Sequence, residues 1–140
     1  MFFKRLKLIG YVRTDGSELS RELQCRTIKE YCLARDHQLL ALYYDDGPPG
    51  MGLLTALRNL EKVDGLVTYD LSRLVEKSDC STESAAFISK HFLASKKKIV
   101  AIADNLENTS SLGEENLRNR LATYSDVDHI HDAMVIDLRN

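Results

Sequence analysis

The sequence predicts an α/β domain with a central, mainly parallel sheet of four to five strands, flanked by helices and followed by a long C-terminal helix. Short apolar runs alternate with segments of helical spacing, and this alternation is typical of a parallel sheet covered by helices. Near the end of the chain, apolar residues recur at steps of three or four, which indicates one long helix. A length of 140 residues suffices for a domain with its own core.

Each element of this fold has its own signal. Four apolar runs rich in strand-forming residues predict strands at residues 6–12, 39–44, 65–69 and 99–103. Helical spacing predicts the intervening helices at about residues 18–36, 53–60 and 85–92. Polar or glycine-containing turns follow the first two strands, at residues 14–17 and 45–49.

The C-terminal segment divides the chain into an α/β core, residues 1–113, and a long helix, residues 114–140. We expect this helix to dock on a partner subunit and to form a homodimer or higher oligomer, because its apolar stripe extends beyond what a small sheet can cover. Packing back on its own domain is the alternative. The stripe consists of Leu117, Leu121, Tyr124, Val127, Ile130, Met134 and Leu138. Nothing after this helix predicts a helix-turn-helix DNA-binding domain.

The net charge of −2 conceals a gradient along the chain. Residues 1–13 carry +4, whereas residues 104–140 carry −5. Neutralising phosphates supplies most of a DNA binder's affinity, so we expect only weak or indirect DNA contact. The lysines Lys96, Lys97 and Lys98 stand at the end of a predicted helix, where the helix dipole and solvent favour them.

Composition also limits cofactors and location. The three cysteines, Cys25, Cys32 and Cys80, have no paired spacing, and burial as small apolar side chains explains the first two. No metal site or cofactor is expected. The sequence has no apolar run long enough to span a membrane and no secretory signal, so we expect a cytoplasmic protein without membrane contact.

Four segments resemble, in order and spacing, the catalytic domain of the serine recombinases of the resolvase and invertase family. They are residues 10–17, 43–47, 66–74 and 105–113. The first contains Tyr11 and Arg13 in the arrangement of the family opening Tyr-x-Arg-x-Ser, whose serine attacks a DNA phosphodiester. The third resembles the family segment Leu-Asp-Arg-Leu-Ser-Arg. The resemblance implies a resolvase-like catalytic-domain fold.

The departures from the family pattern fall where the chemistry should be. Asp15 stands at the nucleophile position, Ser72 replaces an aspartate and Glu76 replaces an arginine. Phosphodiester transfer needs a hydroxyl nucleophile and cations around the phosphate, and two of these changes put negative charge there instead. We therefore expect no ordinary strand exchange and name no catalytic residue. The residual phosphate-site residues are Tyr11, Arg13, Asp45 (or Asp46) and Arg73.

The leading hypothesis is a catalytically degenerate serine-recombinase-like protein that acts as a regulatory or scaffolding dimer in DNA recombination or mobile-element control. An active recombinase is a candidate partner. Arg13 and Arg73 would then either hold a phosphate or form ordinary salt bridges.

Two alternatives remain open. In the first alternative, the chain is an active recombinase fragment without its DNA-binding domain, and Ser17 is the nucleophile. The competing role for Ser17 is to cap the first helix. In the second alternative, acids that follow the strands form a Mg²⁺-binding pocket. These acids are Asp15, Asp45 or Asp46, Asp70 and Asp104. Capping of the following helices explains them as well.

Overall fold

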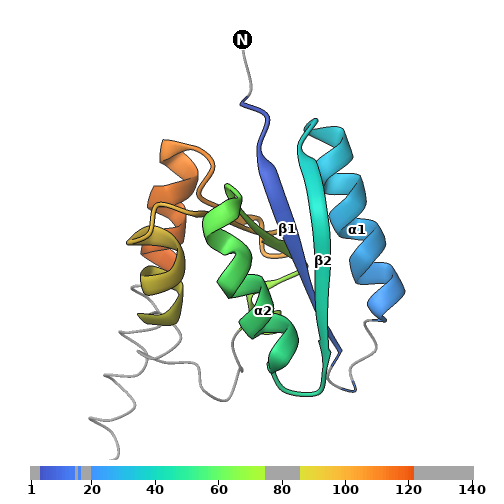
Figure 1. Cartoon of the computed structure of the whole chain (residues 1–140). Coiled ribbons are helices and arrows are strands. Elements are labelled where there is room, and N and C mark those ends of the chain that lie inside the picture. The colour runs from blue at the N-terminus through green and yellow to red at the C-terminus, as the bar shows by residue number, and fades with distance from the viewer. Residues whose placement is uncertain (1–3, 15, 17–19, 75–85, 122–140) are drawn as a thin grey trace, which may run out of the picture.

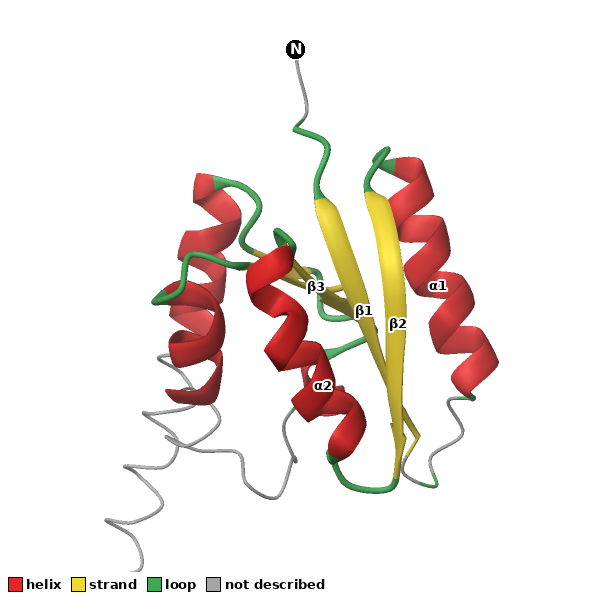
Figure 2. Ribbon diagram, viewed as in Figure 1, coloured by secondary structure: helices red, strands yellow, loops and turns green. Residues whose placement is uncertain are grey.

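The chain folds into three layers around one twisted sheet (Figures 1 and 2). The computed structural model describes residues 4–14, 16, 20–74 and 86–121. Its strands lie in the order β2-β1-β3-β4-β5, and β5 alone of these five runs antiparallel to its neighbour. They are β1 (Lys7–Thr14), β2 (Gln38–Asp46), β3 (Gly65–Thr68), β4 (Lys98–Ala101) and β5 (Leu106–Glu107).

Helices cover the two faces of the sheet unequally. Helix α1 (Arg21–Ala34) packs on one face. Helix α2 (Met51–Asn59) and the helical segments 86–93 and 111–121 pack on the other, to the left in Figure 1. Within the segment 86–93, Ser89–Leu93 form a π-helix. Two 3₁₀ turns, η1 (Leu60–Lys62) and η2 (Leu71–Arg73), flank β3.

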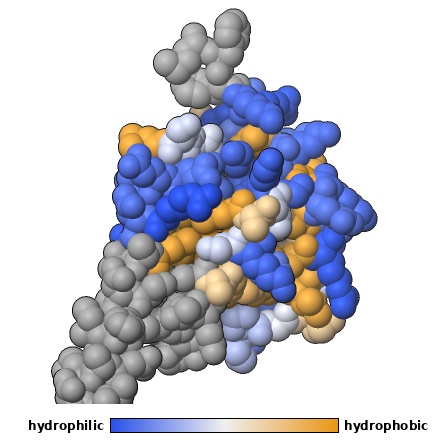
Figure 3. All heavy atoms as spheres, turned by 90° about the vertical axis from the view of Figure 1, so that its left-hand side faces the viewer, coloured by the Kyte–Doolittle hydropathy of each residue, from blue (hydrophilic) through white to orange (hydrophobic). Residues whose placement is uncertain are grey.

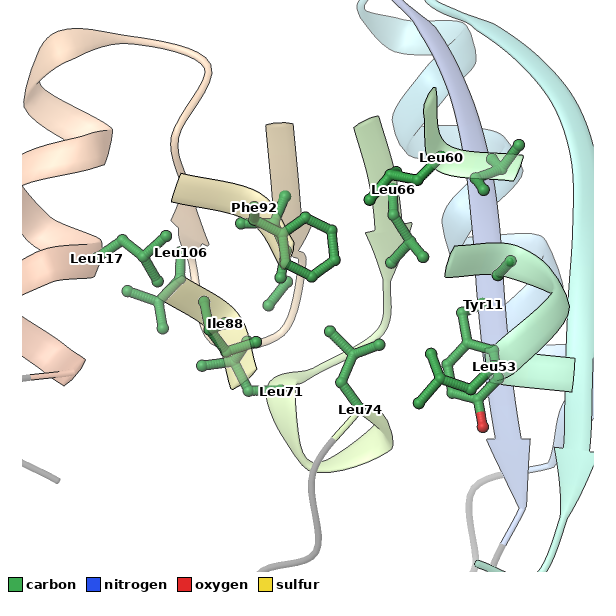
Figure 4. Close-up of a cluster of buried hydrophobic side chains, with 14 of the residues drawn as sticks. Tyr11, Leu53, Leu60, Leu66, Leu71, Leu74, Ile88, Phe92, Leu106 and Leu117 are labelled. Atoms are coloured by element: carbon green, nitrogen blue, oxygen red, sulfur yellow. The ribbon is translucent and has the colours of Figure 1, made fainter. Parts of the chain in front are cut away.

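Successive side chains along the strands point to opposite faces of the sheet and form two apolar cores. Leu8 and Val12 of β1 face Ile28 and Cys32 of α1. Ile9 and Tyr11 of the same strand point to the opposite face and belong to the larger core, which includes residues of α2. Figure 4 shows the larger core, where side chains from α2, η2 and the two left-hand helical segments meet over β1, β3 and β4. This packing fixes the ends of the strands, where the candidate site lies.

The α/β class, the mainly parallel sheet and the flanking helices are confirmed. Strand β5 has only two residues, too few for a periodic signal in the sequence. The predicted cap of the first helix is wrong: Ser20, not Ser17, accepts the hydrogen bond from the Leu23 N–H, at 3.0 Å. The helix therefore begins at Arg21, three residues later than the sequence indicates.

The last described helix begins at residue 111, and its first two stripe residues pack inside their own domain. Leu117 and Leu121 are 1% and 5% exposed and belong to the larger core. For these two residues the contact is intramolecular, which corresponds to the alternative that the sequence left open. The remaining stripe residues, Tyr124, Val127, Ile130, Met134 and Leu138, lie outside the described residues, so the dimerisation helix stays a prediction.

Cys32 is buried in the smaller core, and burial raises the pKa of its thiol to about 11. A thiol with such a pKa stays protonated at neutral pH and acts as a small apolar group. Among the helices of the described part of the chain, none combines the length and the hydropathy needed to cross a membrane.

Candidate functional site at the carboxyl ends of the strands

The residues singled out from the sequence converge at the carboxyl ends of β1, β2 and β3. Arg13 is the penultimate residue of β1, Asp45 is the penultimate residue of β2, and Arg73 ends the η2 turn after β3. The parallel register places Arg13 opposite Asp45. In an open α/β sheet this end is where ligands bind.

Arg13 is almost fully buried, with an exposed fraction of 2%. Its guanidinium donates to three main-chain carbonyl oxygens: from Nε to Arg73 at 2.8 Å, from Nη1 to Gly47 at 3.0 Å, and from Nη2 to Ser72. Its own main chain is held by Gln24 of α1, which donates to the Arg13 carbonyl at 2.9 Å. Arg13 thus ties the end of β1 to the turn after β2 and to η2.

Arg73 reciprocates this contact. It is 5% exposed, and its Nη1 donates to the carbonyl oxygen of Arg13 at 2.8 Å. Its Nε donates to Oδ1 of Asp70 at 3.1 Å, and the Ser72 hydroxyl donates to the same oxygen at 2.6 Å. The Asp70 carboxylate therefore accepts hydrogen bonds from both the Ser72 hydroxyl and the Arg73 guanidinium. From the sequence, Asp70 was expected to be either a metal ligand or a helix cap. Its place three residues before Arg73 was the signal for the ion pair.

Asp45 binds Tyr11 and the start of α2. Its Oδ2 accepts from the Tyr11 hydroxyl at 2.8 Å and from the N–H groups of Gly50 and Leu53, each at 2.9 Å. Its Oδ1 accepts from the Gly52 N–H at 2.8 Å. Burial alone would raise the pKa of Asp45, but the main-chain N–H groups and the tyrosine hydroxyl outweigh burial and lower the pKa below 3.8. The carboxylate thus caps α2 in its charged form.

Asp15, Ser17 and Glu76 lie outside the described residues. The other acids of this end each have a partner: Asp46 accepts from the Thr14 hydroxyl, and Asp104 accepts from the Leu71 N–H at 2.7 Å. Within the described ranges, no group of three histidine, cysteine, aspartate or glutamate side chains is placed to hold a metal ion. The Mg²⁺ alternative therefore depends on Asp15.

A surface hollow of about 640 Å³ lies elsewhere, on the α1 face of the sheet. Tyr31 and Arg35 of α1, Val100 of β4 and Glu107 of β5 contribute to its lining. None of the residues of the arginine and aspartate cluster lines it. The cluster and the hollow are separate features.

The fold is that of the catalytic domains of serine recombinases. The structure superposes on the N-terminal catalytic domain of TP901-1 integrase with a TM-score of 0.73 and 18% identity, over 91% of this chain and 98% of that one. A resolvase family site-specific recombinase from Streptococcus pneumoniae gives a TM-score of 0.65 and 15% identity, over 97% of this chain and 100% of that one.

A third similar structure is the C-terminal catalytic domain of ISC1926 TnpA, an IS607-like serine recombinase. It gives a TM-score of 0.56 and 19% identity, over 69% of both chains. No protein-family model and no curated protein sequence matches this chain. The likeness therefore concerns the fold, and it agrees with the resemblance of the four sequence segments.

Proposed function

We propose that this chain is a serine recombinase relative that has lost strand exchange and acts as a regulatory or scaffolding subunit in DNA recombination or mobile-element control. The observation that carries the proposal is the set of hydrogen bonds made by the buried Arg13 guanidinium. Its guanidinium faces the main-chain carbonyls of Gly47, Ser72 and Arg73, while the sequence places Asp15 where the family has its nucleophile.

The bonding of Arg13 explains why an arginine remains where the nucleophile does not. A hydrogen bond from a charged group contributes about 1.5–3 kcal/mol, so releasing three of them to grip a phosphate is costly. Arg73 is likewise bound to Asp70 and to the Arg13 carbonyl. Both side chains therefore have a role in stability that does not require catalysis.

The mixed-subunit part of the proposal is tested by affinity capture from the source cells, with and without nuclease. Recovery of an intact recombinase that survives nuclease treatment supports it. Recovery of the chain by itself contradicts the regulatory role. The loss of catalysis is tested separately, by searching for a denaturant-resistant covalent adduct between the protein and a pool of random-sequence duplex DNA. We expect no adduct.

The active-recombinase alternative makes the opposite prediction in the same assay. An adduct that disappears in Ser17→Ala would identify Ser17 as the nucleophile, whereas an adduct that disappears in Asp15→Ala alone would identify an aspartyl nucleophile. Either result overturns the loss of catalysis.

Dimerisation is supported by the apolar stripe at residues 124–138. In sedimentation experiments, the charged substitution Ile130→Asp should shift a dimer to monomer. Asp128→Asn, which changes a charge in the same segment at a position that is not one of the stripe residues, is the matched control and should leave the dimer intact. A monomeric wild-type chain contradicts this part of the proposal.

A further inference from the structure

Exposed basic side chains gather at the opposite end of the sheet, where the strands begin. Strands β1 to β4 are parallel, so their amino ends meet at one edge, at the top in Figure 1. The register pairs Lys7 with Gln38, Leu8 with Gly65, and Gly65 with Lys98. Segments that are far apart in the sequence therefore lie side by side.

We call this end the basic pole and define it by residues 4–7, 35–38, 61–64 and 96–98. It contains eight basic and three acidic side chains, which gives a net charge of +5 in a chain whose total is −2. The basic residues are Lys4, Arg5, Lys7, Arg35, Lys62, Lys96, Lys97 and Lys98. All but the last two are exposed. In Figure 3, hydrophilic residues cover much of the upper part of the face in view, with some apolar residues between them.

Some of these charges are already used inside the domain. Lys97 donates from Nζ to the carbonyl oxygens of Val63 at 2.8 Å and Glu61 at 3.3 Å, and Lys98 donates to that of Asn108 at 3.2 Å. Lys97 thus bonds to the segment before β3, and Lys98 to the segment after β5. Their place at the end of a predicted helix did not indicate these contacts.

The other basic residues of the pole are exposed, and one of them, Arg35, places its guanidinium over the Tyr31 ring, 4.0 Å from the ring centroid. Lys96 stands in a left-handed turn, with φ of 58°, and is exposed. The ion pairs between described residues are Arg73 with Asp70 and Arg118 with Glu114, and neither involves the pole. The Asp64 carboxylate accepts from the Lys7 main-chain N–H at 2.7 Å, and no ion pair between the two side chains is formed among the described residues. The field of the pole is therefore directed outward.

We propose that the basic pole binds the phosphate backbone of duplex DNA without reading its sequence. Four adjacent strand ends span about 15 Å at a strand spacing of about 4.8 Å. A duplex presents one negative charge per about 1.7 Å of its axis, so a pole of this width meets several phosphates. The described residues of the pole form strand ends and turns, with no helix or hairpin that projects to enter a groove, so the contact is to the backbone.

The carboxyl end of the sheet is the weaker candidate for this contact. Arg13 and Arg73 are buried and bonded there, and the exposed charges among its described residues are mixed: Asp46 and Glu22 are acidic, and Arg21 is basic but lies over the Tyr44 ring. The proposal goes beyond the regulatory role and does not depend on it, since a subunit can join a recombinase with or without its own DNA contact.

The test is fluorescence anisotropy of a duplex of about 20 base pairs with random sequence, titrated with the full chain at about 50 mM and about 200 mM salt. The pole variant carries Lys4→Ala, Arg5→Ala and Lys96→Ala. The control variant removes three exposed positive charges elsewhere, with Arg26→Ala, Arg118→Ala and Arg120→Ala. Circular dichroism confirms that both variants fold.

The wild type should bind in the range of about 10⁻⁶–10⁻⁴ M, which is typical of backbone-only contact. The pole variant should bind at least about tenfold more weakly at the lower salt, and the slope of log K against log salt should fall by up to about 3, since each phosphate contact contributes about 0.9. The control should bind like the wild type.

Three outcomes overturn the proposal: no binding by the wild type at the lower salt, equal binding by the pole variant, or equal loss in both variants. Sedimentation in the absence of DNA distinguishes the competing use of the same surface. If the pole variant changes the oligomeric state while DNA binding stays as in the wild type, the pole is a protein interface and the DNA proposal is wrong.

Discussion

The two ends of the sheet carry charge in opposite ways. At the carboxyl end, Arg13, Arg73 and Asp45 each bond to groups of their own domain. At the amino end, Lys4 and Lys96 are exposed, with no ion pair among the described residues. Charge bonded inside the domain stabilises the fold, and charge left in solvent is available to a partner. The end that resembles a catalytic site is thus the better candidate for a structural role.

The largest effect should come from Arg13→Ala. The substitution leaves the carbonyls of Gly47, Ser72 and Arg73 without this donor. We expect the free energy of unfolding to fall by about 3–4 kcal/mol, because three charge-assisted hydrogen bonds are lost while the cost of burying the charge is relieved. Urea denaturation measures the change.

Arg13→Lys is the matched control, since it keeps the charge but loses the planar fork that reaches three oxygens. It should recover only part of the stability. A loss below about 1 kcal/mol in Arg13→Ala would show that the buried arginine is not the tie between the loops, and the contrast between the two ends would disappear.

Asp45→Asn should have the next largest effect. The amide keeps the shape but has only one acceptor oxygen in place of two, so it cannot reproduce all the bonds to α2 and Tyr11. We expect a loss of about 2 kcal/mol, at the upper end of the range for a helix cap. Asp46→Asn, an exposed neighbour, is the control and should change stability by less than about 0.5 kcal/mol.

The pH dependence sharpens the Asp45 prediction. The folded-state pKa of Asp45 lies below its unfolded value, so its contribution is fully present above about pH 3.8 and is lost as the pH falls through the folded pKa. In acid titrations followed by circular dichroism, Asp45→Asn should therefore lose less stability than the wild type below this pH. Equal losses would contradict the cap.

Much of the fold could be predicted from the sequence because the three central strands, β1, β3 and β4, are buried on both faces. Continuous apolar runs such as residues 65–69 have few other interpretations once helices flank them. The start of the first helix was harder to predict, since Ser17 and Ser20 are equally good cap residues by type. The contacts of the helix, Ile28 in the smaller core and Gln24 on the Arg13 main chain, join residues that are distant in the sequence.

The site was predicted as a set of residues but not as a network. The motif placed Tyr11, Arg13, Asp45 and Arg73 at one end of the sheet, and the structure brings them there. The described partners of the Arg13 guanidinium are main-chain carbonyls, which carry no side-chain signal in the sequence, whereas Arg73 forms an ion pair with Asp70. The basic pole was missed for a similar reason, because it assembles from four separate segments that only the sheet register joins.

At the amino end of the sheet, we expect His37 to make a smaller contribution to the free energy of unfolding. Its Nδ1 accepts a hydrogen bond from the Leu6 N–H at 3.1 Å. Burial and nearby Arg35 lower its pKa, against the opposite influence of Asp36 and Asp64. Because the folded state disfavours the protonated ring, the contribution of His37 is present above about pH 6.5 and is lost as the pH falls through the folded pKa.

His37→Ala should therefore cost about 1 kcal/mol near neutral pH and less in acid. Chemical denaturation between about pH 5 and pH 7.5 measures this difference. The pKa of His91 is also lowered by burial, so the wild type keeps part of its pH dependence in either case. The comparison of wild type with His37→Ala isolates one histidine, and a difference that does not change with pH would contradict the role of Nδ1 as acceptor.

The smallest effect, and one of opposite sign, is expected for the pole variant Lys4→Ala, Arg5→Ala, Lys96→Ala. Removing like charges from one surface relieves repulsion, so the free energy of unfolding should stay level or rise by up to about 0.5 kcal/mol. Salt screens exposed charges, and the gain should vanish above about 0.5 M salt. A clear loss of stability would mean that these side chains are bonded within the domain as Arg13 is. The amino end would then be a second structural cluster, and weakened DNA binding by this variant would no longer argue for a phosphate-binding surface.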